Sequence, residues 1–260
     1  MLNNKKKMFG ELKGKQPYTV LEAKVNSCGV DRNLYFAVFK ENQILGNFPF
    51  FYSYSNEQKG INPLYNGGLY EQIISSFVFD LLLRLPKDFT FLDIGANVGY
   101  YSVMCAGRRR DSTILSFEPH PVIYKILEMN SKLYKNIKPY MCGISSKESK
   151  ETLFCDNRNI EGHSFVAKYG DNKGFQEDIG MYKVECAMHT LGFFGVDWEK
   201  VSLMKIDVQG MEMEILKNIW EDIKDGTYVI IEADDGLEEF LLNKKVEILC
   251  RHIQNYIFRK

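Results

Sequence analysis

The chain has 260 residues, of which 45% are hydrophobic and 26% are charged, a size suited to one large α/β domain with a small extension. Its 33 Lys and Arg nearly balance its 34 Asp and Glu, and the net charge of −1 argues against a nucleic-acid or anionic-membrane partner. No apolar run reaches the roughly 18 residues that a membrane span requires, so we expect no membrane-spanning segment.

Residues 1–62 read as a small N-terminal extension ahead of a main domain at 63–260. The extension contains strand-like runs at 19–25 and 34–39 and an aromatic stretch at 48–54. Predicted helices at 71–83, 121–134 and 210–219 then alternate with predicted strands at 89–92, 112–117, 137–141, 203–206 and 228–231. This alternation predicts a doubly wound, mainly parallel, Rossmann-like α/β sheet that binds its ligand at the carboxyl ends of its strands.

Residues 151–200 interrupt this alternation. They are rich in Gly, Asn and Asp, and they stand between the third and fourth predicted strands. We expect a long loop or hairpin insertion there, at the functional edge of the sheet, where it would help to select the substrate.

Residues 91–100 (FLDIGANVGY) carry the most informative pattern. An apolar strand ends in Asp93, and Gly95 and Gly99 follow four residues apart before a helix-like run. A dinucleotide-binding turn would end with glycines three residues apart, and a carboxylate there would repel a pyrophosphate. Asp93 suits a cationic ligand and favours S-adenosylmethionine, which carries an ammonium and a sulfonium; helix capping is the alternative role.

The residues after Asp93 have separate expected roles. Gly95 would let the backbone approach the ligand closely, because it has no Cβ. Asn97 would either adopt a left-handed turn conformation or hydrogen-bond the ligand. Gly99 would permit close packing of the strand against the helix.

A second acid supports a nucleotide-like ligand. Glu118 ends the second predicted strand 19 residues after Gly99, where α/β nucleotide sites accept ribose hydroxyls. Pro119 fixes the turn that directs this acid.

Three motifs in this order resemble the FkbM-type S-adenosylmethionine-dependent methyltransferases. They are residues 93–100 (DIGANVGY), 117–121 (FEPHP) and 205–212 (KIDVQGME), and the upstream segment 67–71 (GGLYE) is also similar. The resemblance covers roughly residues 65–235. It implies a class I methyltransferase fold, S-adenosylmethionine as donor, and O-methylation of a sugar, glycan or small metabolite. The predicted donor-binding residues are Asp93, Gly95, Asn97, Gly99, Tyr100, Glu118, Pro119, Cys142 and Gly143.

The chain departs from this family in three respects. Gln209 stands where the family often has Glu, and Gly192 stands where Asp is common. Class I sheets usually close with two further strands, whereas this sequence shows only one, near 256–258, after a helix expected over 237–254. Either the sheet is truncated or an N-terminal strand fills its edge.

The candidate catalytic residues lie in or near the last half of the predicted domain. Asp207 ends the fourth strand and is the candidate for orienting or deprotonating the acceptor hydroxyl, with helix capping as the alternative. Lys205 faces the same side of that strand and would lower the pKa of Asp207 or bind an anionic substrate; a surface lysine that extends to solvent is the alternative. His163, in the insertion, and His189, just before the fourth strand, are candidate general bases.

No metal is predicted. The carboxylates of Asp207, Glu232 and Asp234 are suitable ligands for a hard cation, but no spacing requires one. The six cysteines form no CxxC pair and read as free thiols of a reducing compartment. Residues 1–20 lack the apolar core of a signal peptide, so we expect a cytoplasmic protein.

Two alternative functions use the same fold. An RNA 2′-O-methyltransferase would need a basic, aromatic-lined groove, which the near-zero charge does not favour. A non-catalytic binding protein of methyltransferase fold would not need the intact acids and glycines of the three motifs. We therefore expect a small-molecule or glycan acceptor and no nucleic acid.

Overall fold

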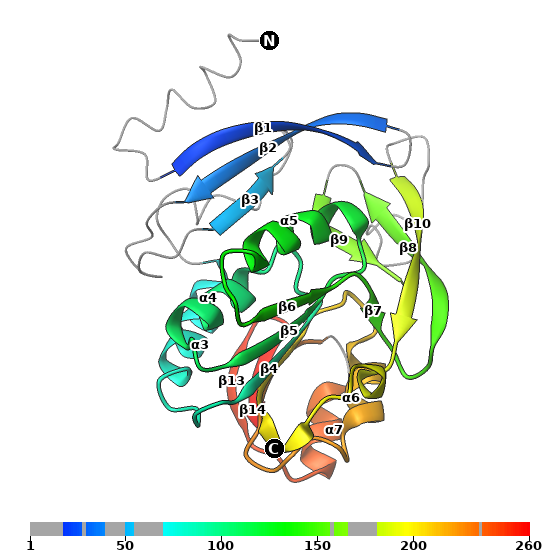
Figure 1. The fold of residues 1–260 in the computed structure, drawn as a ribbon. Coiled ribbons are helices and arrows are strands. Elements are labelled where there is room, and N and C mark those ends of the chain that lie inside the picture. Colours follow the sequence, from blue (N-terminus) through cyan, green and yellow to red (C-terminus); the bar gives the residue numbers. More distant parts are fainter. Residues whose placement is uncertain are drawn as a thin grey trace.

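The computed structural model describes residues 18–27, 30–39, 50–54, 70–156, 159–165, 181–233 and 236–260. Its centre is a seven-stranded sheet with the order β13-β14-β12-β11-β4-β5-β6 (Figure 1). The parallel strands are β4 Thr90–Ile94, β5 Thr113–Phe117, β6 Ile137–Tyr140, β11 Val201–Ile206 and β12 Tyr228–Glu232. The first of them in the chain, β4, lies between β5 and β11, so the strand order reverses there and creates the ligand-binding edge typical of doubly wound sheets.

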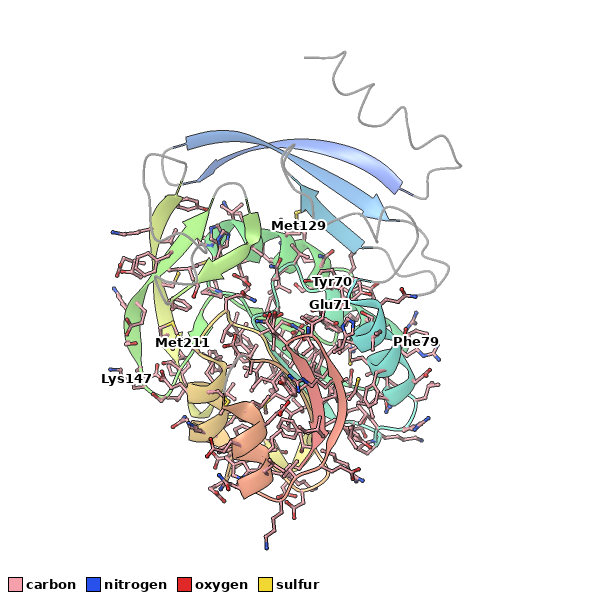
Figure 2. The ribbon with its side chains drawn as sticks, turned by 180° about the vertical axis from the view of Figure 1, so that it is seen from behind. Tyr70, Glu71, Phe79, Met129, Lys147 and Met211 are labelled. Carbon is pink, nitrogen blue, oxygen red and sulfur yellow. The ribbon has the colours of Figure 1, made fainter. Side chains whose placement is uncertain are left out.

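Helices cover both faces of this sheet. The helices are α3 Gln72–Leu81, α4 Tyr100–Arg108, α5 Pro121–Ser131, α6 Glu212–Ile219 and α7 Leu237–Asn243. Alternate strand residues point to opposite faces: Phe91 packs with α3, α4 and α5, whereas Leu92 packs with α6 and α7. Figure 2 labels Phe79 and Met211, partly buried side chains that border these two apolar layers. The strands are therefore apolar on both sides, as a buried parallel sheet requires.

The β4–α4 and β5–α5 units begin as the sequence predicts. Strand β5 ends at Phe117, directly before Glu118, and α5 starts with Pro121 at its first position. The His120 ring caps α5 by accepting hydrogen bonds from the backbone N–H groups of Val122 and Ile123. Local signals therefore fix where these two elements begin and end.

A C-terminal hairpin closes the sheet beyond β12. Its strands are β13 Ile248–His252 and β14 Asn255–Arg259, and β14 runs antiparallel to β12. The helix expected over 237–254 begins at Leu237 as predicted but ends at Asn243, and the short strand expected near 256–258 is confirmed as β14. Both expected forms of the sheet edge are wrong. Helix α7 ends early, Lys245 adopts a left-handed φ of 57°, and burial over 248–252 alternates with the period of a strand.

Two smaller sheets accompany the central one. Antiparallel strands β1 Tyr18–Ser27, β2 Val30–Phe39 and β3 Phe50–Tyr54 confirm the strand-like runs near the N-terminus, and β3 lies beside α5 (Figure 1). The other sheet contains β7 Gly143–Ile144, β8 Ser149–Asp156, β9 Asn159–Ser164 and β10 Met181–His189. The insertion is thus largely stranded where the structure describes it, with 166–180 outside the described residues. The domain division at residue 62 stays a prediction.

Short 3₁₀ helices, η2 Leu191–Phe194 and η3 Trp198–Lys200, lead from β10 into β11. No helix in the described part of the chain combines the length and apolarity needed to cross a bilayer. Cys105 and Cys142 are buried free thiols and Cys250 is a partly exposed one, as expected for these three residues, and Cys155 and Cys186 are also buried.

The C-terminal hairpin should contribute strongly to stability. Phe258 on β14 is 0% exposed, and its ring centroid lies 6.1 Å from that of Trp220. Phe258→Ala should lower the free energy of unfolding by about 3–5 kcal/mol, because it opens a cavity in the core. Urea denaturation measures this loss. Leu242→Ala, at a side chain that is 74% exposed, is the control and should change stability by about 0.5 kcal/mol or less. A similarly small loss for Phe258→Ala would contradict the hairpin's place in the core.

Candidate active site

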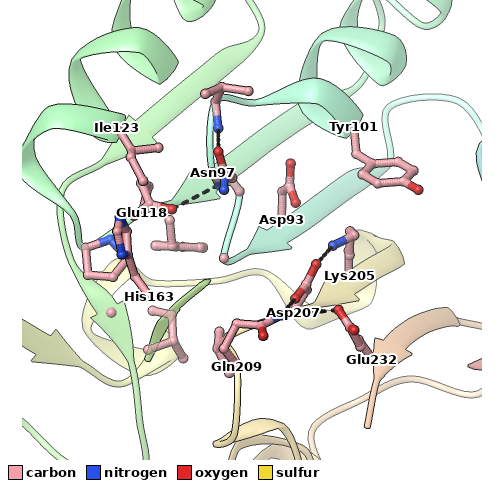
Figure 3. A pocket seen from close by; sticks show the side chains of 18 of the residues that line it. Asp93, Asn97, Tyr101, Glu118, Ile123, His163, Lys205, Asp207, Gln209 and Glu232 are labelled. Atoms are coloured by element: carbon pink, nitrogen blue, oxygen red, sulfur yellow. Dashed lines mark hydrogen bonds and ion pairs between the residues drawn. The ribbon is translucent and has the colours of Figure 1, made fainter. Parts of the chain in front are cut away.

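A cavity of about 330 Å³ opens at the carboxyl edge of the central sheet (Figure 3). Its walls come from the ends of β4, β5, β11 and β12, from the segment before α3, and from the end of β9. This volume lies within the range of small-molecule sites. Five carboxyl side chains line the cavity: Glu71, Asp93, Glu118, Asp207 and Glu232.

The turn after β4 brings the chain back against β11. The N–H groups of Gly95 and Ala96 both donate to the Phe117 carbonyl, at 3.0 and 2.9 Å. Gly95 has a φ of 78°, and a Cβ added there would lie 1.7 Å from the Asp207 carbonyl oxygen. The close neighbour that requires glycine at this position is therefore the Asp207 backbone. The expected approach of a ligand to Gly95 stays a prediction.

Asn97 and Glu118 join the ends of β4 and β5. The Asn97 N–H donates to Glu118 Oε2 at 3.0 Å, and the His120 N–H donates to Oε1 at 2.8 Å. Asn97 has a φ of 51°, so it adopts the left-handed turn conformation considered for it, and its Oδ1 accepts from the Val98 N–H at 2.8 Å. Burial raises the pKa of Glu118 to about 7 despite the two opposing backbone hydrogen bonds.

Asp93 is buried with one oxygen satisfied and the other not. Its Oδ2 accepts a hydrogen bond from Ser102, whose hydroxyl also lies 2.7 Å from that of Ser116. Its Oδ1 has no hydrogen-bond partner among the described residues. Burial raises the pKa of Asp93 and outweighs the opposing charge of Lys205. A buried, unpartnered carboxyl oxygen beside a cavity indicates a polar ligand with a hydrogen to donate.

Lys205 and Asp207 form a buried ion pair on β11. Lys205 Nζ lies 2.5 Å from Asp207 Oδ2, and Lys205 stands opposite Asp93 in the β11–β4 register. Burial disfavours the Lys205 ammonium, but the charges of Asp207, Glu71 and Asp93 outweigh this effect and raise its pKa. Burial likewise disfavours the Asp207 carboxylate, but Lys205 lowers its pKa overall. Both groups are therefore charged at neutral pH.

Comparison with known proteins identifies the family in which this arrangement of strand ends and acids occurs. The family model of the methyltransferase FkbM domain matches residues 93–255, which include the ends of β4, β5, β11 and β12 at the cavity. The chain belongs to the FkbM methyltransferase family.

Individual relatives are distant from this FkbM methyltransferase. Methyltransferase sdnD of Sordaria araneosa is 27% identical over an alignment of 195 positions, and the match covers 64% of this chain and 73% of that protein. The hexuronic acid methyltransferase AglP of Haloferax volcanii is 24% identical over 159 residues, or 61% of each protein. Among solved structures, a putative caffeoyl-CoA O-methyltransferase from Staphylococcus aureus has a TM-score of 0.46 and 12% identity over 74% of this chain and 85% of that one. The SAH-bound Podospora anserina methyltransferase PaMTH1 has a TM-score of 0.43 and 11% identity over 73% and 78%.

Most of the predicted donor-binding residues lie together at the cavity of this methyltransferase. Those that line it are Asp93, Gly95, Asn97, Tyr100, Glu118, Pro119, Cys142 and Gly143. Gly99 does not line it. A Cβ on Gly99 would lie 2.7 Å from Cδ1 of Leu127, so this glycine accommodates α5 beside the start of α4.

The predicted catalytic residues divide into two groups. Lys205, Asp207 and His163 line the cavity, and Figure 3 shows His163 near Glu118. His189 does not line it. Its Nδ1 pairs with Glu148 and its ring stacks on Phe193 at 4.2 Å, at the end of β10. The sequence places His189 shortly before β11, but it does not show that His189 ends a strand of a different sheet.

Sequence reasoning missed the wall formed by Glu71 and Tyr101. The Tyr101 hydroxyl donates to Glu71 Oε2 at 2.7 Å, and Asn255 Nδ2 donates to Oε1 at 3.2 Å. The Lys205 ammonium lies 5.1 Å from the centroid of the Tyr101 ring. The similarity of segment 67–71 to the family was the one available signal for Glu71.

One group of side chains beside the cavity resembles a metal site. The ligand atoms of His120, Cys155 and His163 lie within 4.8 Å of one another. However, His120 Nδ1 accepts from the N–H groups of Val122 and Ile123, so the ring hydrogen is on Nε2, which faces the Tyr182 hydroxyl at 2.6 Å. A metal ion on His120 would displace one of these bonds. We therefore interpret His120 as a helix cap and assign no metal to this cluster.

Gly95→Ala should destabilise this methyltransferase strongly. The added Cβ cannot occupy the space of the Asp207 carbonyl, so the β4 and β11 ends must separate. We expect the free energy of unfolding to fall by more than about 3 kcal/mol in urea denaturation. Gly195→Ala is the matched control, since Gly195 has a φ of 60° but no atom within 4 Å of its Cβ position. It should lose only about 1–2 kcal/mol, the cost of a left-handed φ. Equal losses would show that the contact with Asp207 is not the cause.

Proposed function

We propose that the chain transfers a methyl group from S-adenosylmethionine to a hydroxyl of a sugar, glycan or small metabolite. The observation that carries this proposal is the pair of buried acids, Asp93 and Glu118, at the ends of adjacent parallel strands beside one cavity. One acid suits the ammonium end of this donor and the other suits its ribose.

The residues present fit this donor. The unpartnered Oδ1 of Asp93 would accept from its ammonium group. Glu118 uses one lone pair on each oxygen for a backbone N–H, and the remaining lone pairs would accept from ribose hydroxyls. Ile123, Cys142 and Ile144 line the cavity near the end of β5 and would form an apolar wall for the adenine ring.

The acceptor would bind at the side of the cavity formed by β11 and β12. S-adenosylmethionine supplies an electrophilic methyl group and leaves as a neutral thioether. Positioning the acceptor hydroxyl in line with this methyl accounts for a large part of such a rate, with effective molarities of about 10⁵–10⁸ M in well-oriented systems. Asp207 is held in place by Lys205 and Gln209 and would orient the hydroxyl.

Two features support a sugar-like hydroxyl as the acceptor. The carboxyl oxygens of Glu71, Asp207 and Glu232 accept hydrogen bonds from hydroxyl groups, and the rings of Tyr70 and Tyr101 add apolar area to the same cavity. The relative AglP is named a hexuronic acid methyltransferase, which supports the same class. The net charge of −1 does not favour RNA.

Glu118 should make donor binding depend on pH. Its pKa is about 7 in the ligand-free protein, and ribose hydroxyls donate to its ionised form. The affinity for S-adenosylhomocysteine should therefore level off above about pH 7 and fall up to tenfold for each pH unit below. Glu118→Gln should bind about 10- to 100-fold more weakly at pH 8 and lose this dependence. Glu128→Gln, outside the cavity on α5, is the control and should keep the wild-type profile. Calorimetry across the pH series measures both effects, and unchanged binding by Glu118→Gln would contradict the ribose assignment.

The acceptor class is tested with methyl-labelled S-adenosylmethionine. We would incubate the protein with a pool of metabolites and oligosaccharides from a cell extract and identify the labelled product by mass spectrometry. The label should appear as an O-methyl ether on a sugar or small metabolite, and Asp207→Asn should reduce its yield. Label found in RNA would contradict the proposed acceptor and would identify RNA as the acceptor instead. No detectable binding of donor at millimolar concentration would contradict the enzymatic role itself.

A further inference from the structure

Two carboxyl groups meet at the acceptor side of the cavity. Asp207 follows β11 and Glu232 ends β12, its neighbour in the sheet. The Gln209 amide lies between them, with Nε2 3.0 Å from Asp207 Oδ1 and 3.3 Å from Glu232 Oε2 (Figure 3). Gln209 has a left-handed φ of 57°, and its backbone carbonyl accepts a hydrogen bond from the hydroxyl of buried Ser164 of β9. Its position is therefore fixed from two sides.

Asp207 is poorly suited to accept a proton. Its Oδ2 is paired with Lys205 Nζ and its Oδ1 accepts from Gln209. Protonation of Asp207 would leave the buried Lys205 ammonium without its counter-ion, which is strongly unfavourable. Asp207 therefore remains a carboxylate, and its two oxygens hold Lys205 and Gln209 in position.

Glu232 has the opposite environment. It lines the cavity with its side chain partly exposed, and the charged groups around it are Asp207, Lys205 and Glu71. Burial raises its pKa to about 8, and the nearby charge of Asp207 adds to this shift. Of the two carboxyls, Glu232 is the one that holds a proton near neutral pH. The next acids in the chain, Asp234 and Asp235, lie outside the described residues.

We propose that Glu232 is the general base of the methyl transfer and that Asp207 is its positioning partner. This assignment rests on the proposed function. As the acceptor oxygen bonds to the methyl carbon, the methyl–sulfur bond breaks and its electron pair remains on sulfur. The hydroxyl proton moves to the Glu232 carboxylate and then to solvent. A carboxylate held among like charges is a stronger base than an ordinary glutamate, which suits the removal of a proton from an alcohol.

The protonation state of Glu232 can be tested without an acceptor. The experiment is an NMR pH titration of the full chain with isotope-labelled glutamate carboxyl carbons. One resonance should titrate near pH 8 and disappear in Glu232→Gln. In Asp207→Asn it should titrate at lower pH, because the neighbouring negative charge is gone while Lys205 remains. The Glu118 resonance, expected near pH 7, is the internal control and should persist in both variants. Titration of Glu232 in the ordinary glutamate range would overturn the proposal.

The catalytic role is tested with the acceptor found in the labelling experiment. Glu232→Gln should lower kcat by about 100-fold or more and abolish the rise of kcat with pH toward 8, while S-adenosylhomocysteine still binds. Glu232→Asp should restore part of kcat and the pH dependence. Glu128→Gln, outside the cavity on α5, is the control and should retain both kcat and that dependence.

The outcomes separate the two proposals. If Glu232→Gln keeps the wild-type kcat and pH profile, the base assignment is overturned while the proposed methyl transfer stands. If the wild-type protein binds S-adenosylhomocysteine but transfers methyl to no hydroxyl, the proposed function is wrong, and the role of Glu232 as base is then wrong as well. If Glu232→Gln loses kcat but Glu232→Asp does not recover the pH dependence, Glu232 shapes the site and is not the base.

Discussion

The organisation of the active site depends on one buried cation. Lys205 is 4% exposed on a central strand, a position where an uncompensated ammonium would cost several kcal/mol. Acids reach it from three elements: Asp207 from the turn after its own strand, Asp93 across the sheet, and Glu71 from before α3. Because these acids are needed to keep Lys205 charged, the same requirement gathers three of the five carboxyls that line the cavity. Stability of the sheet centre and chemistry at its edge are therefore coupled.

The sheet topology converts this charge cluster into a binding site. Strand β11 lies between β4 and β12, so Asp93, Asp207 and Glu232 lie at the ends of neighbouring strands, at one edge of the sheet. The turn after β4 approaches the Asp207 carbonyl so closely that only glycine fits at residue 95. This contact joins the turn after β4, on the donor side of the cavity, to the end of β11 on the acceptor side.

Short-range patterns allowed much of this to be predicted from the sequence. The strand, turn and helix at residues 91–100 and the acid at Glu118 each depend on neighbours within a few residues, so their positions were predicted correctly. The C-terminal hairpin was missed because apolar residues at 248–252 fit a helix or a strand until a partner strand is known. His189 was misplaced relative to the cavity for a similar reason: pairing of β10 with β7 and β8 sets its location. Glu71 reaches Tyr101 and Asn255 over large sequence separations that no local pattern encodes.

Gln209 shows how one departure from the family pattern acquires a physical meaning. A glutamate is common at this position in the family, and its charge would add a third negative group between Asp207 and Glu232. The amide instead offers N–H donors to both carboxyls. With the amide present, Asp207 can stay ionised against Lys205 while a proton resides on Glu232 alone. A glutamate at residue 209 would either hold a second proton or repel both neighbours. Glutamine at residue 209 therefore favours a single labile proton on the Asp207–Glu232 pair, and Glu232 holds it.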